Sequence, residues 1–321
     1  MPVLRAAARR FAIFIGTVLV ASVVIFLLVQ ALPGDVAQAT LGMGASPEAV
    51  ETLRQRWGLN QPLVTRYLQW ITGMMTGDFG ASYATGASVL SQIAPCLAVT
   101  GWLVGLSIPL SLLVSLPLGM VAAMMRRRPL GVIVNAGSHV GLAIPVFFAG
   151  TVASIIFAVK LSWLPANGYV PASVSASGWL EHIILPVAAI VLAQSCFLGR
   201  YVRAGFIDVL SEDYYRTARA VGWTKWRGLL RHGLRNMATS LATVVGMQVA
   251  SLLVGAVLVE QVFVLPGLGR LLIQAVAAHD LMVVQAVVML LVFTVLAVNF
   301  LIDVAYLAID PRLVSARGGR A

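Results

Sequence analysis

The sequence contains very little charge and few residues of the types that perform chemistry. Only 11% of its 321 residues are charged, and it has two cysteines, four histidines and two lysines. Neither lysine lies in the glycine-rich Gly-Lys-Ser/Thr pattern that cradles nucleotide phosphates. The Gly-x-Ser-x-Gly, His-Glu-x-x-His and Cys-x-x-Cys patterns are also missing from the sequence. We therefore predict neither an enzyme nor a metal site, and we expect no cofactor in this chain.

Apolar residues make up 60% of the chain. They gather in six runs close to the length of about 20 residues that a membrane-crossing helix needs. The runs cover residues 11–32, 97–125, 132–159, 183–200, 237–260 and 282–308. Lipid offers the backbone no hydrogen bonds, so each run must be helical. The sequence predicts an all-α polytopic membrane protein with six transmembrane helices in a single domain, 1–321.

Basic residues are distributed unevenly around these runs. Seventeen of the 22 Lys and Arg residues lie in the two tails and in the second and fourth gaps between runs. These segments share one side of a six-span protein, so the positive-inside rule predicts that both termini are cytoplasmic. It also predicts that residues 33–95 form an extracytoplasmic insertion and that residues 200–236 form a cytoplasmic loop. This bias accounts for the net charge of +10 without a nucleic-acid partner.

The predicted outer insertion carries clear helix signals. Ser46-Pro47-Glu48 is typical of a helix start, and Gly58 can end that helix. A second helix is expected after Pro62, with residues that share a helical period and predict one apolar face: Leu63, Tyr67, Leu68, Ile71, Met74 and Met75. This face could lie on the membrane surface or on neighbouring spans.

The stretch EDYYRTARAVGWTKWRGLLRHGLRN, residues 212–236, is the most charged part of the chain. We expect helix to continue from span four to Val221, where Gly222 can adopt a positive φ and end it. Thr224 can cap a second short helix. Ala218 and Gly222 are four residues apart and predict a small-residue face that a partner could approach closely. A solvated loop that obeys the positive-inside rule explains the same residues equally well.

Other residues within the spans are candidates for roles in transport. Polar side chains inside spans tend to face protein or a water-filled cavity, so the pathway candidates are Ser111, Gln194, Gln248 and Ser251. The row of Ser107, Ser111 and Ser115 is typical of helix packing. We expect a structural or gating turn in a group that comprises Glu260, Pro266, Gly267 and Gly269. Proline is expected to kink or start a span at Pro145 and Pro186.

The charged stretch also resembles the conserved cytoplasmic loop of ABC importer permeases. The general pattern is Glu-Ala-Ala, three residues, Gly, nine residues and Ile-x-Leu-Pro. Here 216–218 occupies the first triplet and Gly222 the glycine, while the Glu and the Pro are absent. The segments DYYRTARAVG and LLRHGLRN look like the variant found in peptide importers.

Further segments resemble the B-type permease subunit of dipeptide, oligopeptide and nickel importers. In chain order they are ALPGD (31–35), WGLNQPLVTRYLQW (57–70), GDFGASY (77–83), LSWLPANGY (161–169), VLVEQVFVLPGLGRLL (257–272), HDLMVVQA (279–286) and DVAYLAIDPR (303–312). The resemblance implies the type I ABC importer permease fold, with six spans and an outer insertion after span one. It also implies that the chain forms half of a pathway for di- and oligopeptides in the inner membrane.

The partners implied by the resemblance are a second, C-type permease, one or two ABC ATPase subunits that bind ATP and Mg, an extracytoplasmic binding protein, and lipid. The segment of about Glu212–Gly222 corresponds to the coupling helix that docks on the ATPase. The coupling residues are then Asp213, Tyr215, Arg216, Thr217, Ala218, Arg219, Ala220 and Gly222.

Three alternatives stay open. A secondary transporter would use an ion gradient, although such carriers usually place an acid or a histidine at mid-membrane, and Glu260 and Asp303 lie towards the span ends. A non-transporting scaffold would use the cytoplasmic loop only to bind a partner. The same importer could also carry a nickel chelate or a glutathione-like molecule.

Overall fold

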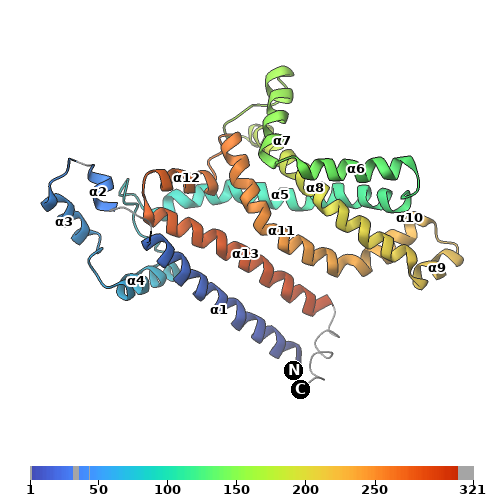
Figure 1. The fold of residues 1–321 in the computed structure, drawn as a ribbon, viewed down its shortest axis with the longest axis horizontal. Coiled ribbons are helices and arrows are strands. Elements are labelled where there is room, and N and C mark those ends of the chain that lie inside the picture. Colours follow the sequence, from blue (N-terminus) through green and yellow to red (C-terminus); the bar gives the residue numbers. More distant parts are fainter. Residues whose placement is uncertain (1, 32–35, 43, 310–321) are drawn as a thin grey trace. The chain divides into compact units, whose positions relative to one another are not determined.

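The computed structural model describes residues 2–31, 36–42 and 44–309, and within them helices dominate (Figure 1). Five of these helices are long and apolar enough to cross a membrane. They are α1 (Pro2–Gln30), α5 (Val89–Met124), α8 (Ala176–Ser211), α11 (Leu234–Val262) and α13 (Leu281–Ile309). The all-α membrane fold predicted from the apolar runs is confirmed, and five of the six predicted spans are continuous helices.

The third predicted span is broken rather than straight. Helix α6 (Pro129–Ala143) and the following segment Val146–Lys160 meet at 100°, and together they are long and apolar enough for one span. That segment begins as α7 (Val146–Ala153) and continues as π-helix to Lys160. Pro145 causes the break, because a proline disfavours helical geometry in the residue before it and Ile144 is extended, with φ −88° and ψ 116°. The expected effect of Pro145 is confirmed, and a single helix over 132–159 is wrong.

The chain divides into two compact units, and each is described by itself. The first holds the residues up to Thr100 and those from Pro266 onward, and the second holds Gly101–Leu265. In the first unit α1 lies beside α13 (Figure 1). The guanidinium of Arg10 lies 2.7 Å from a carboxylate oxygen of Asp303, and four phenylalanine rings contact one another between the helices: Phe11, Phe14, Phe293 and Phe300.

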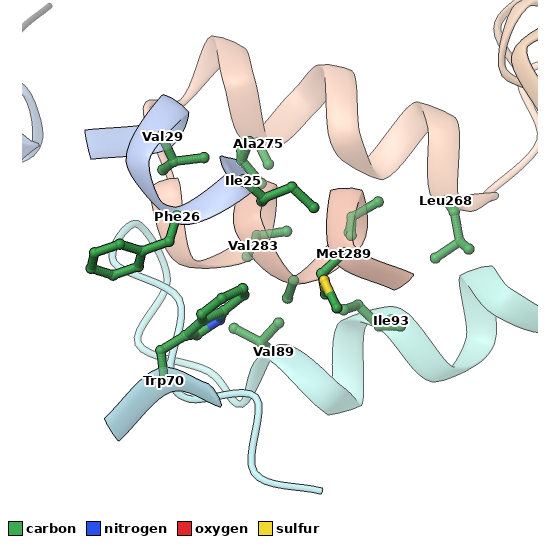
Figure 2. Packing of buried hydrophobic residues seen from close by; sticks show 13 residues of the cluster. Ile25, Phe26, Val29, Trp70, Val89, Ile93, Leu268, Ala275, Val283 and Met289 are labelled. Carbon is green, nitrogen blue, oxygen red and sulfur yellow. The ribbon is translucent and has the colours of Figure 1, made fainter. Parts of the chain in front are cut away.

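The core of the first unit joins α1, α5, α12 (Leu268–Ala277) and α13 to the outer insertion (Figure 2). The insertion contributes α4 (Leu63–Thr76), whose Trp70 is buried with its ring centroid 6.0 Å from that of Phe26. Leu68 and Met75 of α4 are exposed, Met75 by 82%. The predicted apolar face therefore packs on the core only in part, through Tyr67, Ile71 and Met74.

The local signals in the outer insertion are confirmed. After α2 (Val36–Leu41), α3 (Pro47–Arg56) begins where the Ser46 hydroxyl accepts a hydrogen bond from the backbone N–H of Ala49 at 3.3 Å. Gly58 follows the end of α3 with φ +66°. Of the segment ALPGD, residues 32–35 lie outside the described residues, as do residues 310–312 of DVAYLAIDPR.

The second unit is built around α8 and α11. Helix α8 has 36 residues, which correspond to about 54 Å of helix, well over the roughly 30 Å of a hydrocarbon core. Pro186 lies inside α8 without ending it. Beyond α8 follow α9 (Asp213–Ala220), α10 (Lys225–Gly228) and a π-helical turn, Leu229–Gly233, that leads into α11.

Candidate coupling and pathway sites

The charged stretch forms a short helix set apart from the spans on both sides. Helix α8 ends at Ser211, Glu212 is extended (φ −75°, ψ 145°), and α9 begins at the next residue. Gly222 has φ +96°, so it ends the helix as expected. The Thr224 hydroxyl accepts a hydrogen bond from the N–H of Arg227 at 3.3 Å, which confirms the predicted cap of α10. Helix does not run unbroken from span four to Val221, because Glu212 interrupts it.

A single tyrosine fastens α9 to the rest of the second unit. Tyr215 is 5% exposed and belongs to a buried cluster with Val209, Leu229 and Met237. A side chain at Gly228 would place its Cβ 3.2 Å from the Tyr215 ring, so the glycine allows this close contact. Burial raises the pKa of the Tyr215 phenol, and the nearby Arg219 lowers it in part. Tyr215, predicted as part of the coupling segment, therefore holds α9 against the second unit through its buried side chain.

The face of α9 predicted from the small residues is accessible only in part. Ala218 lies three residues after Tyr215 and is half-buried, so it turns partly towards the protein. Gly222 is exposed, with open space around its Cα. The exposed side carries Thr217, Tyr214 (37% exposed) and Val221 (75% exposed). The predicted small-residue face is therefore partly accessible, and the buried position of Tyr215 beside it could not be read from residue spacing.

The charged residues of α9 make local surface contacts. Arg216 lies 3.4 Å from a carboxylate oxygen of Asp213, and both side chains are at least 70% exposed. Arg219 donates to the carbonyl of Trp223, while Ala220 is exposed. Exposed ion pairs of this kind contribute about 0–1 kcal/mol to stability. The fold therefore depends little on these charges, and a partner can use them.

Three of the four pathway candidates come together inside the second unit. The Gln248 side-chain amide on α11 donates to the Gln194 carbonyl oxygen on α8 at 2.9 Å. These two glutamines line a small cavity of about 10 Å³, and Ser111 of α5 lines it too. The Ser111 hydroxyl is buried and has no hydrogen-bond partner among the described residues. Ser251 is exposed and does not line this cavity.

The serine row of α5 is buried along its whole length. Ser107, Ser111 and Ser115 are each 0–1% exposed. The Ser195 hydroxyl of α8 donates to the Ser111 carbonyl at 3.4 Å. The row therefore lies where α5 approaches its neighbours closely, as small residues in spans usually do.

The predicted gating turn is ordered by backbone contacts. Glu260 is fully buried, and its carbonyl accepts a hydrogen bond from the N–H of Leu265 at 2.9 Å. In the first unit Pro266 and Gly267 precede α12, which contains the buried Gly269. The N–H of Leu268, at the start of that helix, donates to the Thr100 hydroxyl at 2.9 Å.

The sequence assigned no role to Asp280, which is 3% exposed and ties two distant segments of the first unit together. Its carboxylate accepts hydrogen bonds from the Ser82 hydroxyl, the Tyr83 N–H at 3.1 Å and the Ala84 N–H at 3.4 Å. The N–H of Val283 also donates to it at 3.5 Å. An aspartate just before an apolar run signals a helix cap, but the contacts with the outer insertion have no signal in the sequence.

The described residues hold no group of three or more His, Cys, Asp or Glu side chains that could bind a metal ion. The arrangement offers instead an exposed short helix, a polar contact between spans, and an ordered outer insertion.

Comparisons with known proteins match the chain to membrane components of transport systems. The family described as binding-protein-dependent transport system inner membrane component matches residues 115–315, and the N-terminal part of such membrane components matches residues 3–103. A candidate peptide transport system permease protein of Brucella suis biovar 1 is 39% identical over 305 residues, which cover 95% of this chain and 97% of that protein. The glutathione transport system permease protein GsiC of Escherichia coli (strain K12) is 37% identical with the same coverage. A solved amino acid ABC transporter matches with TM-score 0.49 and 16% identity, covering 66% of this chain and 92% of that one.

Proposed function

The chain belongs to the family of binding-protein-dependent transport system inner membrane components, and from this premise we propose that it is the B-type permease of an ATP-driven importer of di- and oligopeptides. As such a component it is a multi-pass inner-membrane protein and not an enzyme. It carries no cofactor, because ATP is used by the partner ATPase, and an extracytoplasmic binding protein is its other partner. A homologous C-type permease would form the second half of the pathway.

One observation carries the proposal that this chain couples to the ATPase. Helix α9 stands apart from the spans, is anchored by the buried Tyr215, and exposes Val221 by 75%. Exposed arginines beside an uncovered valine offer charged and apolar contacts to a protein partner, and arginine is enriched at protein interfaces. An anchored helix can also pass a displacement of the ATPase to the spans, because Tyr215 belongs to a buried cluster that includes residues of α8 and α11.

Affinity purification of the full-length chain from its native membrane tests the proposal. We expect an ABC ATPase and a second homologous permease to co-purify, and ATP hydrolysis of the complex to rise with binding protein and peptide. A chain that purifies without any ATPase, and whose deletion leaves peptide uptake unchanged, would contradict the proposal.

The cargo is proposed from the chemistry of the relatives. Peptides and glutathione are named for proteins 37–39% identical to this chain over nearly its whole length. Both are short amide-linked molecules with free carboxylates. We therefore propose short peptides as the cargo. The alternatives are a glutathione-like molecule and a nickel chelate, and uptake measured with each of the three would distinguish them.

We further propose that the Gln194–Gln248 pair and Ser111 border the pathway. Replacing Gln248 by leucine removes the donor of the 2.9 Å hydrogen bond between α8 and α11. Interhelical hydrogen bonds in membranes contribute only about 0.6 kcal/mol on average, so assembly should survive while the KM or the maximal rate of peptide uptake changes several-fold. Met247→Leu, at the neighbouring and 62% exposed position, is the control. Unchanged kinetics in Gln248→Leu would assign this pair to helix packing alone.

The orientation of the chain follows from its basic residues, and it can be tested with single cysteines. We propose that both termini are cytoplasmic and that the outer insertion is extracytoplasmic. After replacement of Cys96 and Cys196 by alanine, Thr85→Cys should react with an impermeant maleimide in sealed cells. Arg127→Cys, in the loop between α5 and α6, should react only after the membrane is opened. Reaction of both from outside would overturn this topology.

A further inference from the structure

The outer insertion, α1 and α13 together line a pocket that the proposed function does not use. Its volume is about 160 Å³, and all its lining residues belong to the first unit. Trp57 and Tyr83 form an aromatic wall, stacked at 26° with ring centroids 4.4 Å apart. Pockets for drug-sized molecules run from about 300 to 1,000 Å³. This one suits a smaller molecule, or one end of a longer one.

The pocket is rich in hydrogen-bond donors that have no acceptor. The side-chain nitrogens of Gln285 and Trp70 are buried without a partner among the described residues, and these residues are 3% and 7% exposed. Trp70 is labelled in Figure 2. A buried donor without an acceptor costs about 1–3 kcal/mol. Both residues line the pocket, so a ligand that carries an acceptor would stabilise the site if it reached these donors.

A positive charge lies at the same place. Arg66 lines the pocket, is half-buried, and makes no side-chain hydrogen bond or ion pair with the described part of the chain. Tyr83 of the aromatic wall lines the same pocket, and burial raises the pKa of its phenol, Arg66 lowers it in part, and Asp280 raises it. Arginine binds carboxylates through two parallel hydrogen bonds.

One acid also lines the pocket. Asp78 is exposed, and its carboxylate accepts a hydrogen bond from the N–H of Gly80 at 2.9 Å. It would repel a plain anion but would attract the ammonium group of a zwitterion. The lining thus includes donors and a cation for a carboxylate, an acid for an ammonium group, and an aromatic wall.

We propose that this pocket binds the C-terminal end of a short peptide, with its carboxylate on Arg66 and on the buried donors of Gln285 and Trp70. The choice of a peptide as the carrier of the carboxylate rests on the proposed function. The site gives the incoming cargo a binding place on the permease itself, on the proposed extracytoplasmic side.

Equilibrium binding to the full-length chain in lipid nanodiscs, without ATPase or binding protein, tests the site. The probe is the dipeptide Ala-Ala, and the signal is tryptophan fluorescence, because Trp57 and Trp70 line the pocket. We expect saturable binding of Ala-Ala. Its C-terminal amide should bind at least about tenfold more weakly, since a hydrogen bond to a charged group contributes about 1.5–3 kcal/mol.

Variants test whether the binding belongs to this pocket. Arg66→Gln should weaken Ala-Ala binding at least about tenfold and should remove the difference between the acid and the amide. Arg56→Gln makes the same charge change at an exposed position of the insertion outside the pocket, and it should bind like the unaltered chain. No saturable binding, equal binding of acid and amide, or binding that does not depend on Arg66 would overturn the proposal.

Two further readouts separate the explanations. If Arg66→Gln instead weakened capture of the binding protein while Ala-Ala never bound, the carboxylate would come from that protein and the peptide site would be wrong. If Ala-Ala failed to bind while ATP-dependent peptide uptake by the complete importer stayed normal, only the site would fail and the proposed function would stand.

Discussion

Replacing Val221 by aspartate is expected to detach the ATPase from the permease and to lower peptide uptake at least tenfold. Val221 is 75% exposed at the end of α9, so the change should leave the fold of this chain intact. Burial of a valine side chain in an interface contributes about 1.5–3 kcal/mol, which corresponds to roughly 10- to 150-fold in affinity. A carboxylate at the same place adds the cost of removing a charge from water.

Recovery of the ATPase on affinity-purified chain measures this effect. Val174→Asp is the matched control, because Val174 is 76% exposed in the loop that precedes α8 and should leave ATPase recovery unchanged. Ala218→Trp is a less direct test, since Ala218 is half-buried and a large ring there would disturb the packing of α9 itself. Normal ATPase recovery and normal uptake in Val221→Asp would favour the solvated-loop interpretation.

Replacing Asp280 by alanine is expected to lower the free energy of unfolding by about 3 kcal/mol or more. The buried carboxylate accepts hydrogen bonds from the Ser82 hydroxyl and from the backbone of Tyr83 and Ala84. Each hydrogen bond to a charged group contributes about 1.5–3 kcal/mol. Without the carboxylate the segment 81–88 loses its tie to the start of α13, so this segment should also become sensitive to protease.

Thermal unfolding in detergent and limited proteolysis both measure the loss. Asp280→Asn keeps the shape of the side chain, but its amide nitrogen is a donor that would face other donors. We therefore expect its free energy of unfolding to lie between those of the unaltered chain and of Asp280→Ala. Asp213→Ala removes an exposed carboxylate and should change the stability by no more than about 0.5 kcal/mol. If Asp280→Ala had the same unfolding temperature and protease resistance as the unaltered chain, the hydrogen bonds of Asp280 would not contribute to stability as proposed.

Features that depend on neighbours in the sequence could be predicted. The long apolar runs specify helices because the bilayer leaves the backbone no other partners. The caps at Ser46 and Thr224 and the positive φ at Gly222 are confirmed, since each depends on only a few adjacent residues. The break at Pro145 was likewise foreseen, although its angle of 100° was not.

Features that depend on distant residues could not be predicted. Asp280 meets Ser82 across 198 residues, and Gln248 meets Gln194 across 54. No local pattern specifies such pairs, because they arise only when helices pack. The burial of Tyr215 could not be predicted for the same reason: it lies in a charged stretch, and only the packed cluster around it shows which side of α9 faces the protein.

Reconstituted transport tests the central claim most directly. Proteoliposomes would hold this chain with the permease and ATPase chains that co-purify with it, and uptake of a labelled dipeptide would be measured with added binding protein. We predict uptake only when ATP is supplied on the ATPase side and binding protein on the other, and background uptake with Val221→Asp. Uptake by this chain without the ATPase, driven by an imposed ion gradient, would contradict the account.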